Sequence, residues 1–210
     1  MPLTLYYRPM ACSLAARIVA AEASLDIDYV AVNLVTGKLT DGGELRADVP
    51  RGQVPALRRA DGTLLMENSS VLPYLAAQAP RSGLMPEIGT EAHWRNLECL
   101  SFVGTELHKR CLYPYYNLRF PQACRDQAAL ELKAVLAALE PMLSPVPAWR
   151  EAEFTVADAY LLWALLLAQR VGVGLTAAPA AQRYLATMMQ RRSVADAVAL
   201  EVAEAHQMGR

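Results

Sequence analysis

The chain has 210 residues, of which 54% are hydrophobic and 20% are charged, and its formal net charge is −1. This length and apolar content suffice for one large domain or two small ones, each with a buried core. A charge so close to zero, with the basic residues scattered, argues against a nucleic-acid partner. The sequence shows no signal-peptide pattern and no apolar run of about 18 residues, so we expect a cytoplasmic protein without a membrane partner.

The four cysteines lie far apart in the sequence, at Cys12, Cys99, Cys111 and Cys124. Their spacing lacks the close pairs that bind zinc, and thiols in the cytoplasm stay reduced. We therefore expect neither a metal site nor a structural disulfide.

Short apolar runs alternate with helical patterns in the first 80 residues. Asp61 and Gly62 stand between two apolar runs, which favours a tight hairpin. The order of elements predicts a small α/β domain in which a βαβ half precedes a ββα half on one mixed four-stranded sheet. The expected strands are 3–7, 27–33, 54–59 and 63–66, the expected helices are 12–24 and 68–79, and 40–48 is ambiguous.

Two prolines and two glycines between residues 80 and 89 indicate a linker, which we assign to 81–88. Beyond it the pattern is helical throughout, and the helix that begins near Thr155 is apolar on all sides, which is typical of the centre of a bundle. Thr155 and Asp158 have the spacing of a helix N-cap pair. The predicted domains are thus 1–80 and 89–210, and the expected helices of the second are 89–112, 122–143, 155–171, 179–190 and 193–206.

Cys12 lies where the strand 3–7 turns into a helix. The first amides of a helix have no intrahelical partners and carry partial positive charge, so they favour a thiolate there. Ala15 stands three residues on, so the chain lacks the second thiol of a Cys-x-x-Cys motif. Cys12 is a candidate reactive sulfur whose disulfide would need an outside thiol. The alternative is a small buried hydrophobe.

The order of these elements, together with three motifs, resembles the glutathione transferase family over nearly the whole chain. The motifs are Gln53-Val54-Pro55-Ala56-Leu57, Glu67-Asn68-Ser69-Ser70 and Thr155-x-x-Asp158. Tyr6–Leu14 and Glu106-Leu107-His108-Lys109 are most similar to the bacterial beta class, which uses an N-terminal cysteine. The resemblance implies the family fold, with a thioredoxin-like N-terminal domain and an all-α C-terminal domain. It also implies a homodimer with glutathione as co-substrate and a role in detoxification.

The resemblance also implies roles for individual residues. Cys12 and His108 would be catalytic, and His108, titrating near neutrality, would hydrogen-bond the ligand sulfur or share a proton with Cys12. A cis Val54-Pro55 bond would present the Val54 backbone to the peptide, and Glu67 would receive the γ-glutamyl ammonium. The implied glutathione-binding residues are Ser13, Lys38, Arg51, Gln53, Val54, Pro55, Glu67, Asn68, Ser69, Glu106 and Lys109, and the implied electrophile pocket is Met10, Tyr113 and Tyr116.

Two positions depart from the family pattern. Asn68 stands where the family commonly has Ser, or Gly in some beta-class members, and it can either donate to the γ-glutamyl carboxylate or obstruct it. Val49 stands where the beta class typically has Asn, and it offers no side-chain donor. The sequence therefore predicts weakened glutathione binding, improved by Asn68→Ser.

The sequence is compatible with more than one role for several residues and with more than one function. The tyrosines near residue 113 fit an electrophile wall or inter-helix packing, whereas His93 and His206 are best interpreted as structural or exposed. A zeta-like isomerase is an alternative function, although Met10 and Ala11 replace the two serines of its motif. A non-catalytic binding or regulatory protein is another. The expected dimer contact is the helix 89–112, with Leu97, Cys99, Leu100 and Phe102.

Overall fold

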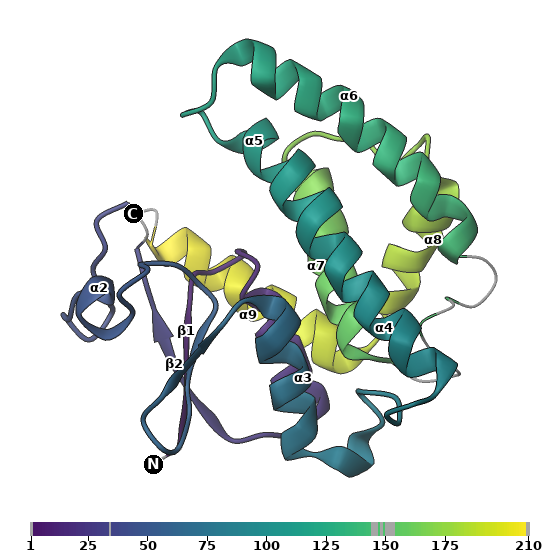
Figure 1. Ribbon diagram of the computed structural model, residues 1–210. Coiled ribbons are helices and arrows are strands. Elements are labelled where there is room, and N and C mark those ends of the chain that lie inside the picture. The colour runs from purple at the N-terminus through teal and green to yellow at the C-terminus, as the bar shows by residue number, and fades with distance from the viewer. Residues whose placement is uncertain (1, 34, 144–146, 148, 150–153, 209–210) are drawn as a thin grey trace. The chain divides into compact units, whose positions relative to one another are not determined.

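The computed structural model describes residues 2–33, 35–143, 147, 149 and 154–208 (Figure 1). The chain forms two compact units, Met1–Leu84 with Arg192–Arg210 and Met85–Arg191. The last helix, which the sequence pattern assigned to the second domain, thus belongs to the first unit. The elements are β1 (Leu3–Tyr7), α1 (Leu14–Glu22), β2 (Ile27–Ala31), α2 (Leu45–Asp48), β3 (Ala56–Arg58), β4 (Leu64–Met66), α3 (Asn68–Gln78), η1 (Pro80–Ser82), α4 (Glu91–Phe102), η2 (Val103–Leu112), α5 (Tyr113–Tyr116), α6 (Gln122–Leu139), η3 (Glu140–Leu143), α7 (Val156–Arg170), α8 (Pro179–Met188) and α9 (Arg192–Met208).

The first unit is built on a four-stranded sheet with the order β2-β1-β3-β4. β1 pairs with β2 in parallel and with β3 antiparallel, and β3 pairs antiparallel with β4. The predicted mixed sheet is confirmed. Between β3 and β4, Gly62 adopts a φ of 82°, and Asp61 Oδ1 accepts the Thr63 amide at 2.9 Å. These are the features that the Asp-Gly pair predicts for a tight turn.

Helices cover both faces of the sheet, and α2 and α3 lie on opposite sides of it (Figure 1). On the α2 side, Tyr6 and Ala56 pack with Leu45 and Val49 in one buried cluster. Because side chains alternate along a strand, Leu5 points to the other side, where α1 packs against both α3 and α9. β1 is therefore buried on both faces, and the turn that follows it starts from a rigid base.

The second unit is helical, and α7 is its centre, as its apolar composition predicts. Ten consecutive residues of α7, from Val156 to Leu165, are buried. Asp158 is fully buried and its carboxylate accepts from Thr155, Trp149 and Tyr184, with the Tyr184 hydroxyl at 2.6 Å. The predicted cap is confirmed, and it also joins the start of α7 to α8.

The helix expected over 89–112 changes character at its midpoint. α4 ends at Phe102, and η2 continues as a π-helix through Leu112. Val103, Gly104 and Thr105 are weak α-helix formers, and the Thr105 hydroxyl donates to the Ser101 carbonyl at 3.0 Å, which competes with the backbone ladder. The wider π turn changes which side chains of 103–112 share a face.

Candidate functional site

The turn between β1 and α1 carries Cys12 and is closed by local hydrogen bonds. The Ala11 amide donates to the Arg8 carbonyl at 3.0 Å, and the Leu14 amide donates to the Ala11 carbonyl at 2.9 Å. Ser13 is fully buried, and its hydroxyl lies 3.2 Å from both the amide and the carbonyl of Arg8. This hydroxyl fixes the turn, and the glutathione-binding role that the resemblance implies for Ser13 stays a prediction.

Cys12 lies next to the proline motif. Its side chain is partly exposed, and its Sγ donates to the Val54 carbonyl at 3.3 Å. The Val54-Pro55 peptide bond is cis, as the resemblance implies. The predicted reactive thiol and the predicted peptide-binding backbone are therefore neighbours, and the Val54 carbonyl already accepts from the thiol.

Glu67 stands between β4 and α3 in a conformation that is uncommon for a residue with a side chain. Its φ is 69°, in the left-handed region. The half-exposed carboxylate forms an ion pair with Arg51, with 2.7 Å between Oε1 and Nη2. The resemblance assigns both Arg51 and Glu67 to glutathione binding, and in this structure the two side chains neutralise each other's charge.

Asn68 begins α3, and its side chain is directed differently from the sequence expectation. The residue is 4% exposed, and its Nδ2 donates to the Cys12 carbonyl at 2.9 Å. The carboxamide nitrogen that we expected at the ligand carboxylate is therefore engaged with the turn. Val49, the other departure, is fully buried in the core beside Tyr6 and Leu45, which explains an apolar residue there.

The remaining predicted residues of the first unit are mostly on its surface. Lys38 is paired with Glu44, with 2.5 Å between Nζ and Oε1, and the same Lys38 hydrogen bond lowers the pKa of Glu44. Gln53 and Ser69 are exposed, whereas Pro55 is buried. Gln53 and Ser69 thus remain accessible to a ligand.

His108 lies in the interior of the second unit. Its Nδ1 is 2.9 Å from the Tyr160 hydroxyl, and its ring centroid is 4.6 Å from that of Trp163. Burial, with a smaller effect of the Lys109 charge, lowers the pKa of His108 to about 3. The imidazole is therefore neutral at physiological pH, and its catalytic role beside Cys12 stays a prediction.

The other two histidines have the expected structural or exposed positions. His93 is buried with its Nδ1 3.0 Å from the Pro86 carbonyl, and His206 is exposed.

An aromatic cluster lies on the surface of the second unit, around α5. Tyr113 contacts Tyr116 and Phe120 edge to face, with centroid distances of 5.9 and 5.7 Å, and all three are more than a third exposed. Lys109 Nζ lies 5.4 Å from the Tyr113 ring centroid. Glu106 is paired with Arg110 at 2.6 Å. Aromatic surface for an apolar ligand is available here, with a cation beside it.

A polar cluster in the first unit was not predicted from the sequence. Glu201 of α9 is fully buried, and its Oε2 accepts the Met10 amide at 2.6 Å, while its Oε1 lies 3.0 Å from Arg17 Nε. Met10 has a φ of 62°, so this bond holds a left-handed residue two positions before Cys12. Desolvation raises the pKa of Glu201 to about 7, against the opposing effects of the Met10 amide and the Arg17 charge.

The signal for this cluster was present in the sequence. Val194, Ala197 and Glu201 recur at helical spacing and are all buried, so Glu201 is a carboxylate on the apolar face of its helix. Such a residue is rarely buried without a partner. Its partners lie near the other end of the chain, which sequence spacing does not indicate.

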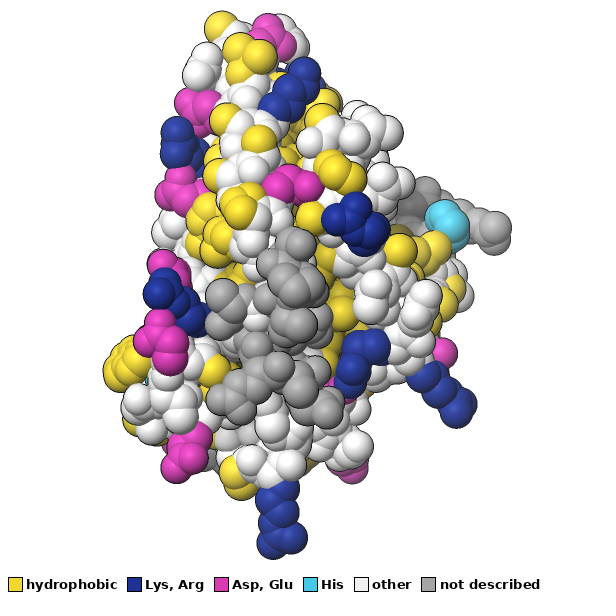
Figure 2. All heavy atoms as spheres, turned by 90° about the vertical axis from the view of Figure 1, so that its right-hand side faces the viewer, with side chains coloured by type: hydrophobic (Ala, Val, Ile, Leu, Met, Phe, Trp, Pro, Cys, Tyr) yellow, Lys and Arg dark blue, Asp and Glu magenta, His cyan; other side chains and the backbone are white. Residues whose placement is uncertain are grey.

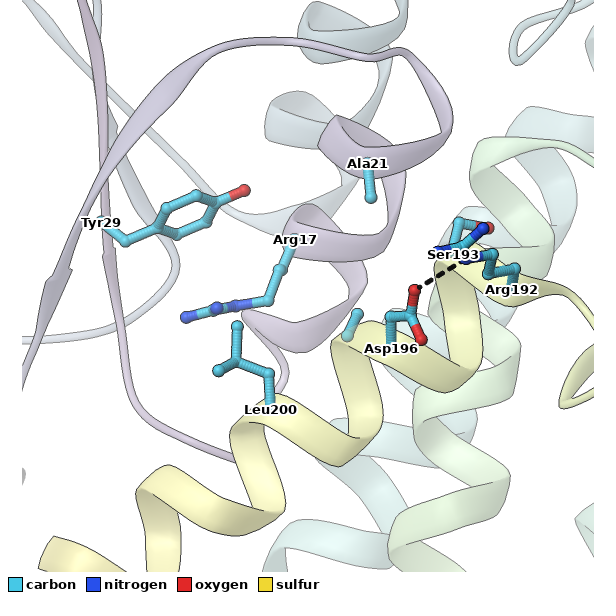
Figure 3. Close-up of a pocket in the computed structure, with 8 residues that line it drawn as sticks. Arg17, Ala21, Tyr29, Arg192, Ser193, Asp196 and Leu200 are labelled. Carbon is cyan, nitrogen blue, oxygen red and sulfur yellow. Dashed lines mark hydrogen bonds and ion pairs between the residues drawn. The ribbon is translucent and has the colours of Figure 1, made fainter.

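Arg17 fills the space between α9 and the sheet. Its guanidinium carbon lies 4.3 Å from the Tyr7 ring centroid and 4.4 Å from that of Tyr29, and burial raises the pKa of Tyr7 to about 12. Figure 3 shows Arg17 projecting from α1 between Tyr29 and Leu200. The open pocket at this place has a volume of about 450 Å³, and none of the residues predicted for the glutathione site lines it.

Among the residues that the structure describes, no group of three or more His, Cys, Asp or Glu side chains is arranged to hold a metal ion. None of the helices formed by those residues has the length and apolar character needed to cross a bilayer.

Comparison with known proteins agrees with this geometry. The family model described as "Glutathione S-transferase, N-terminal domain" matches residues 9–78. Glutathione S-transferase GstA of Escherichia coli O157:H7 is 32% identical over 197 residues, which cover 94% of this chain and 98% of GstA.

Two solved structures show the same fold. A bacterial beta class glutathione S-transferase of Sphingomonas chungbukensis is 35% identical, with a TM-score of 0.88. A sphingomonad glutathione S-transferase complexed with glutathione is also 35% identical, with a TM-score of 0.86. In both comparisons 94% of this chain and 98% of the other chain are covered. The chain has a thiol turn, then a cis proline before a strand, then a helical unit, in the same order as these relatives. It therefore belongs to the glutathione S-transferase family and is similar to its bacterial beta class.

Proposed function

We propose that the protein joins glutathione to small hydrophobic electrophiles and exchanges thiols through Cys12, as part of detoxification in the cytoplasm. The observation that supports this most is the 3.3 Å contact between Cys12 Sγ and the Val54 carbonyl, beside a cis proline and the start of α3. A tripeptide thiol that pairs with the Val54 backbone would bring its sulfur next to Cys12.

Two reactions are compatible with this arrangement. In conjugation, the glutathione sulfur loses its proton to solvent, forms a bond to the electrophilic carbon and displaces the leaving group, while Cys12 is unchanged. In exchange, the Cys12 thiolate attacks one sulfur of oxidised glutathione, a mixed disulfide forms and one glutathione thiolate leaves. A second, different thiolate then attacks the glutathione sulfur of the mixed disulfide, which breaks the bond to Cys12, restores the Cys12 thiolate and releases that thiol joined to glutathione as a new disulfide.

The ligand would be held by charge at one end and by backbone at its centre. Glu67 offers a carboxylate for the γ-glutamyl ammonium, and Gln53, Val54 and Ser69 surround the expected peptide. Arg51 and Lys38 are the nearby cations for carboxylates, although each is paired with a glutamate in this structure. Binding would require these exposed pairs to exchange partners, which costs little because such pairs are weak.

The aromatic cluster is our candidate site for the electrophile. Tyr113 and Tyr116 present half-exposed rings, and Lys109 lies beside Tyr113. On the face drawn in Figure 2, acidic and basic side chains are mixed and neither sign forms a continuous patch.

We also propose that the active protein is a homodimer that uses α4. Cys99 and Leu100 are buried within their own chain, so they do not supply the contact that the sequence suggested. Trp94 on the same helix is 54% exposed and is a better anchor. Light scattering of the native protein should give a molar mass of twice the 23.0 kDa of one chain, and the Trp94→Glu variant should give a lower mass. A single-chain mass for the native protein at micromolar concentration would refute the dimer.

Ligand-dependent unfolding tests the proposed function directly. Glutathione at 100 times its dissociation constant should raise the free energy of unfolding by about 2.7 kcal/mol. The matched control is the isomer of glutathione with an α-linked glutamate, which has the same atoms but cannot place its charges in the same way. No stabilisation by millimolar glutathione, together with no Cys12 adduct from oxidised glutathione by mass spectrometry, would overturn the proposal.

A further inference from the structure

Asn68 contacts the backbone of Cys12 from a distance of 56 positions in the sequence. The Cys12 carbonyl accepts the Asn68 carboxamide at 2.9 Å and the Ala15 amide at 3.3 Å. The bond from Ala15 is longer than the usual 2.7–3.2 Å of an N–H···O bond. The contact from Asn68 is therefore the shorter of these two.

The chemistry of this contact is specific to a carboxamide of this length. Asn68 is 4% exposed, and its Oδ1 has no hydrogen-bond partner among the described residues. A flipped amide would place Oδ1 against the Cys12 carbonyl, with two acceptors facing each other. The aspartate isostere has no donor when ionised, and serine is too short to keep the same contact.

The sulfur and the carbonyl of Cys12 are anchored to different elements. The thiol donates to Val54 before β3, whereas the carbonyl accepts from Asn68 on α3. Losing the Asn68 contact would let Cys12 shift in its turn, and the position of the sulfur relative to the Val54 carbonyl and to the N-terminal end of α1 would change. The N-terminal end of a helix favours a thiolate, so a sulfur that moves away from it loses that stabilisation.

We propose that Asn68 is a positioning residue for Cys12: its carboxamide holds the Cys12 backbone in the turn before α1, so that the sulfur stays beside the Val54 carbonyl. Asn68 then acts on the reacting thiol through the protein, and does not bind the γ-glutamyl carboxylate. The consequence for thiol exchange rests on the proposed function, whereas the effect on the intrinsic reactivity of Cys12 does not.

The reactivity of Cys12 can be isolated because the other thiols differ in exposure. Burial raises the pKa of Cys99 and of Cys111, so neither reacts readily, and Cys124 is exposed. In a Cys124→Ser background, the rate of alkylation by iodoacetamide against pH therefore reports Cys12. Adding Cys12→Ser to that background gives the blank.

Three substitutions of Asn68 and one matched control make the test. Asn68→Ala removes the carboxamide, Asn68→Ser leaves a short donor, and Asn68→Asp keeps the shape without the donor. The control is Asn33→Asp, which adds the same negative charge to the same unit. Asn33 Oδ1 accepts the amides of Val35 and Thr36, and an aspartate carboxylate can accept them in the same way.

All three Asn68 variants should move the alkylation midpoint toward the ordinary cysteine value of about 8.5 and lower the rate at pH 7 by about threefold to tenfold. Asn33→Asp should leave both unchanged. Circular dichroism checks that each variant is folded, and if Asn68→Ala is not folded, Asn68→Ser decides.

A folded Asn68→Ala or Asn68→Ser protein with the native pH profile would overturn the proposal. That outcome is separable from failure of the proposed function, which is judged on the native protein by its response to glutathione. Tighter glutathione binding by Asn68→Ser with an unchanged pH profile would instead restore the role at the ligand carboxylate.

Discussion

Arg51 Nη2 lies 2.7 Å from Glu67 Oε1, so the carboxylate proposed for the γ-glutamyl ammonium already has a cationic partner. Both side chains are about half exposed, with 56% and 52% of their surface accessible to solvent. Pairs of this kind contribute about 0.2–1 kcal/mol, so the ligand can displace Arg51 at small cost. The pair keeps the site neutral until an ammonium group arrives.

Glu67→Gln should weaken glutathione binding by about ten- to hundredfold, because a hydrogen bond to a charged group contributes about 1.5–3 kcal/mol. Titration calorimetry measures the change. Asp196→Asn is the control, since Asp196 is an exposed ion-paired carboxylate of the same unit, held by Arg192. Equal losses in the two variants would mean that net charge, and not the Glu67 contact, governs binding.

Cys12 should form a mixed disulfide with glutathione, and Cys12→Ser should abolish exchange but can spare conjugation. The reason is that a hydroxyl can still lie beside the Val54 carbonyl and the ligand sulfur, whereas it cannot form a disulfide. Mass spectrometry after incubation with oxidised glutathione should show one adduct on the Cys124→Ser protein. An adduct that persists after Cys12→Ser would assign exchange to another thiol.

Stability should depend on pH through Glu201. Because desolvation raises the pKa of Glu201 to about 7 from an ordinary value of 4.5, its contribution is complete below pH 4.5 and is lost as the pH rises through 7. The loss is on the order of 3 kcal/mol. Denaturant unfolding at pH 5 and pH 8 should show this loss of stability in the native protein and not in Glu201→Gln. Glu204 also contacts Arg17, and the control variant Glu204→Gln should still lose stability between these two pH values.

His108 should show no protonation between pH 5 and pH 8. Its lowered pKa means that the folded state disfavours the imidazolium, so this group reduces stability as the pH falls below about 6.5 and toward 3. Proton NMR of the imidazole should leave the His108 signal unmoved, while free histidine in the same tube titrates. A titration midpoint of His108 near neutrality would contradict this prediction and would allow His108 to exchange a proton with Cys12.

The first half of the fold was predictable because its elements are short and separated by clear turn residues. The β1 strand was predicted at its observed bounds, and the Asp61-Gly62 hairpin needs only local chemistry. The π segment was not predicted, because Ser101 and Thr105 act through a side-chain bond that periodicity does not detect.

The cis bond before Pro55 and the closeness of Cys12 to Val54 were predictable from the motifs, whereas the other contacts around Cys12 were not. Motif order brought Cys12 and Val54 together correctly. The direction of the Asn68 carboxamide depends on a backbone carbonyl 56 positions away, and residue identity alone permits either direction. The burial that lowers the pKa of His108 likewise comes from Tyr160 and Trp163 of another helix.

The Met10 amide and the Glu201 carboxylate are 191 positions apart, yet they share a hydrogen bond in one compact unit. A ribosome releases the thiol turn long before it releases α9. The nascent chain can therefore form its sheet while the Met10 amide and the Arg17 guanidinium still lack their carboxylate. A fragment that stops at the linker would lack the Glu201 carboxylate permanently. The unit that contains the thiol turn is therefore completed only after the helical unit has been synthesised.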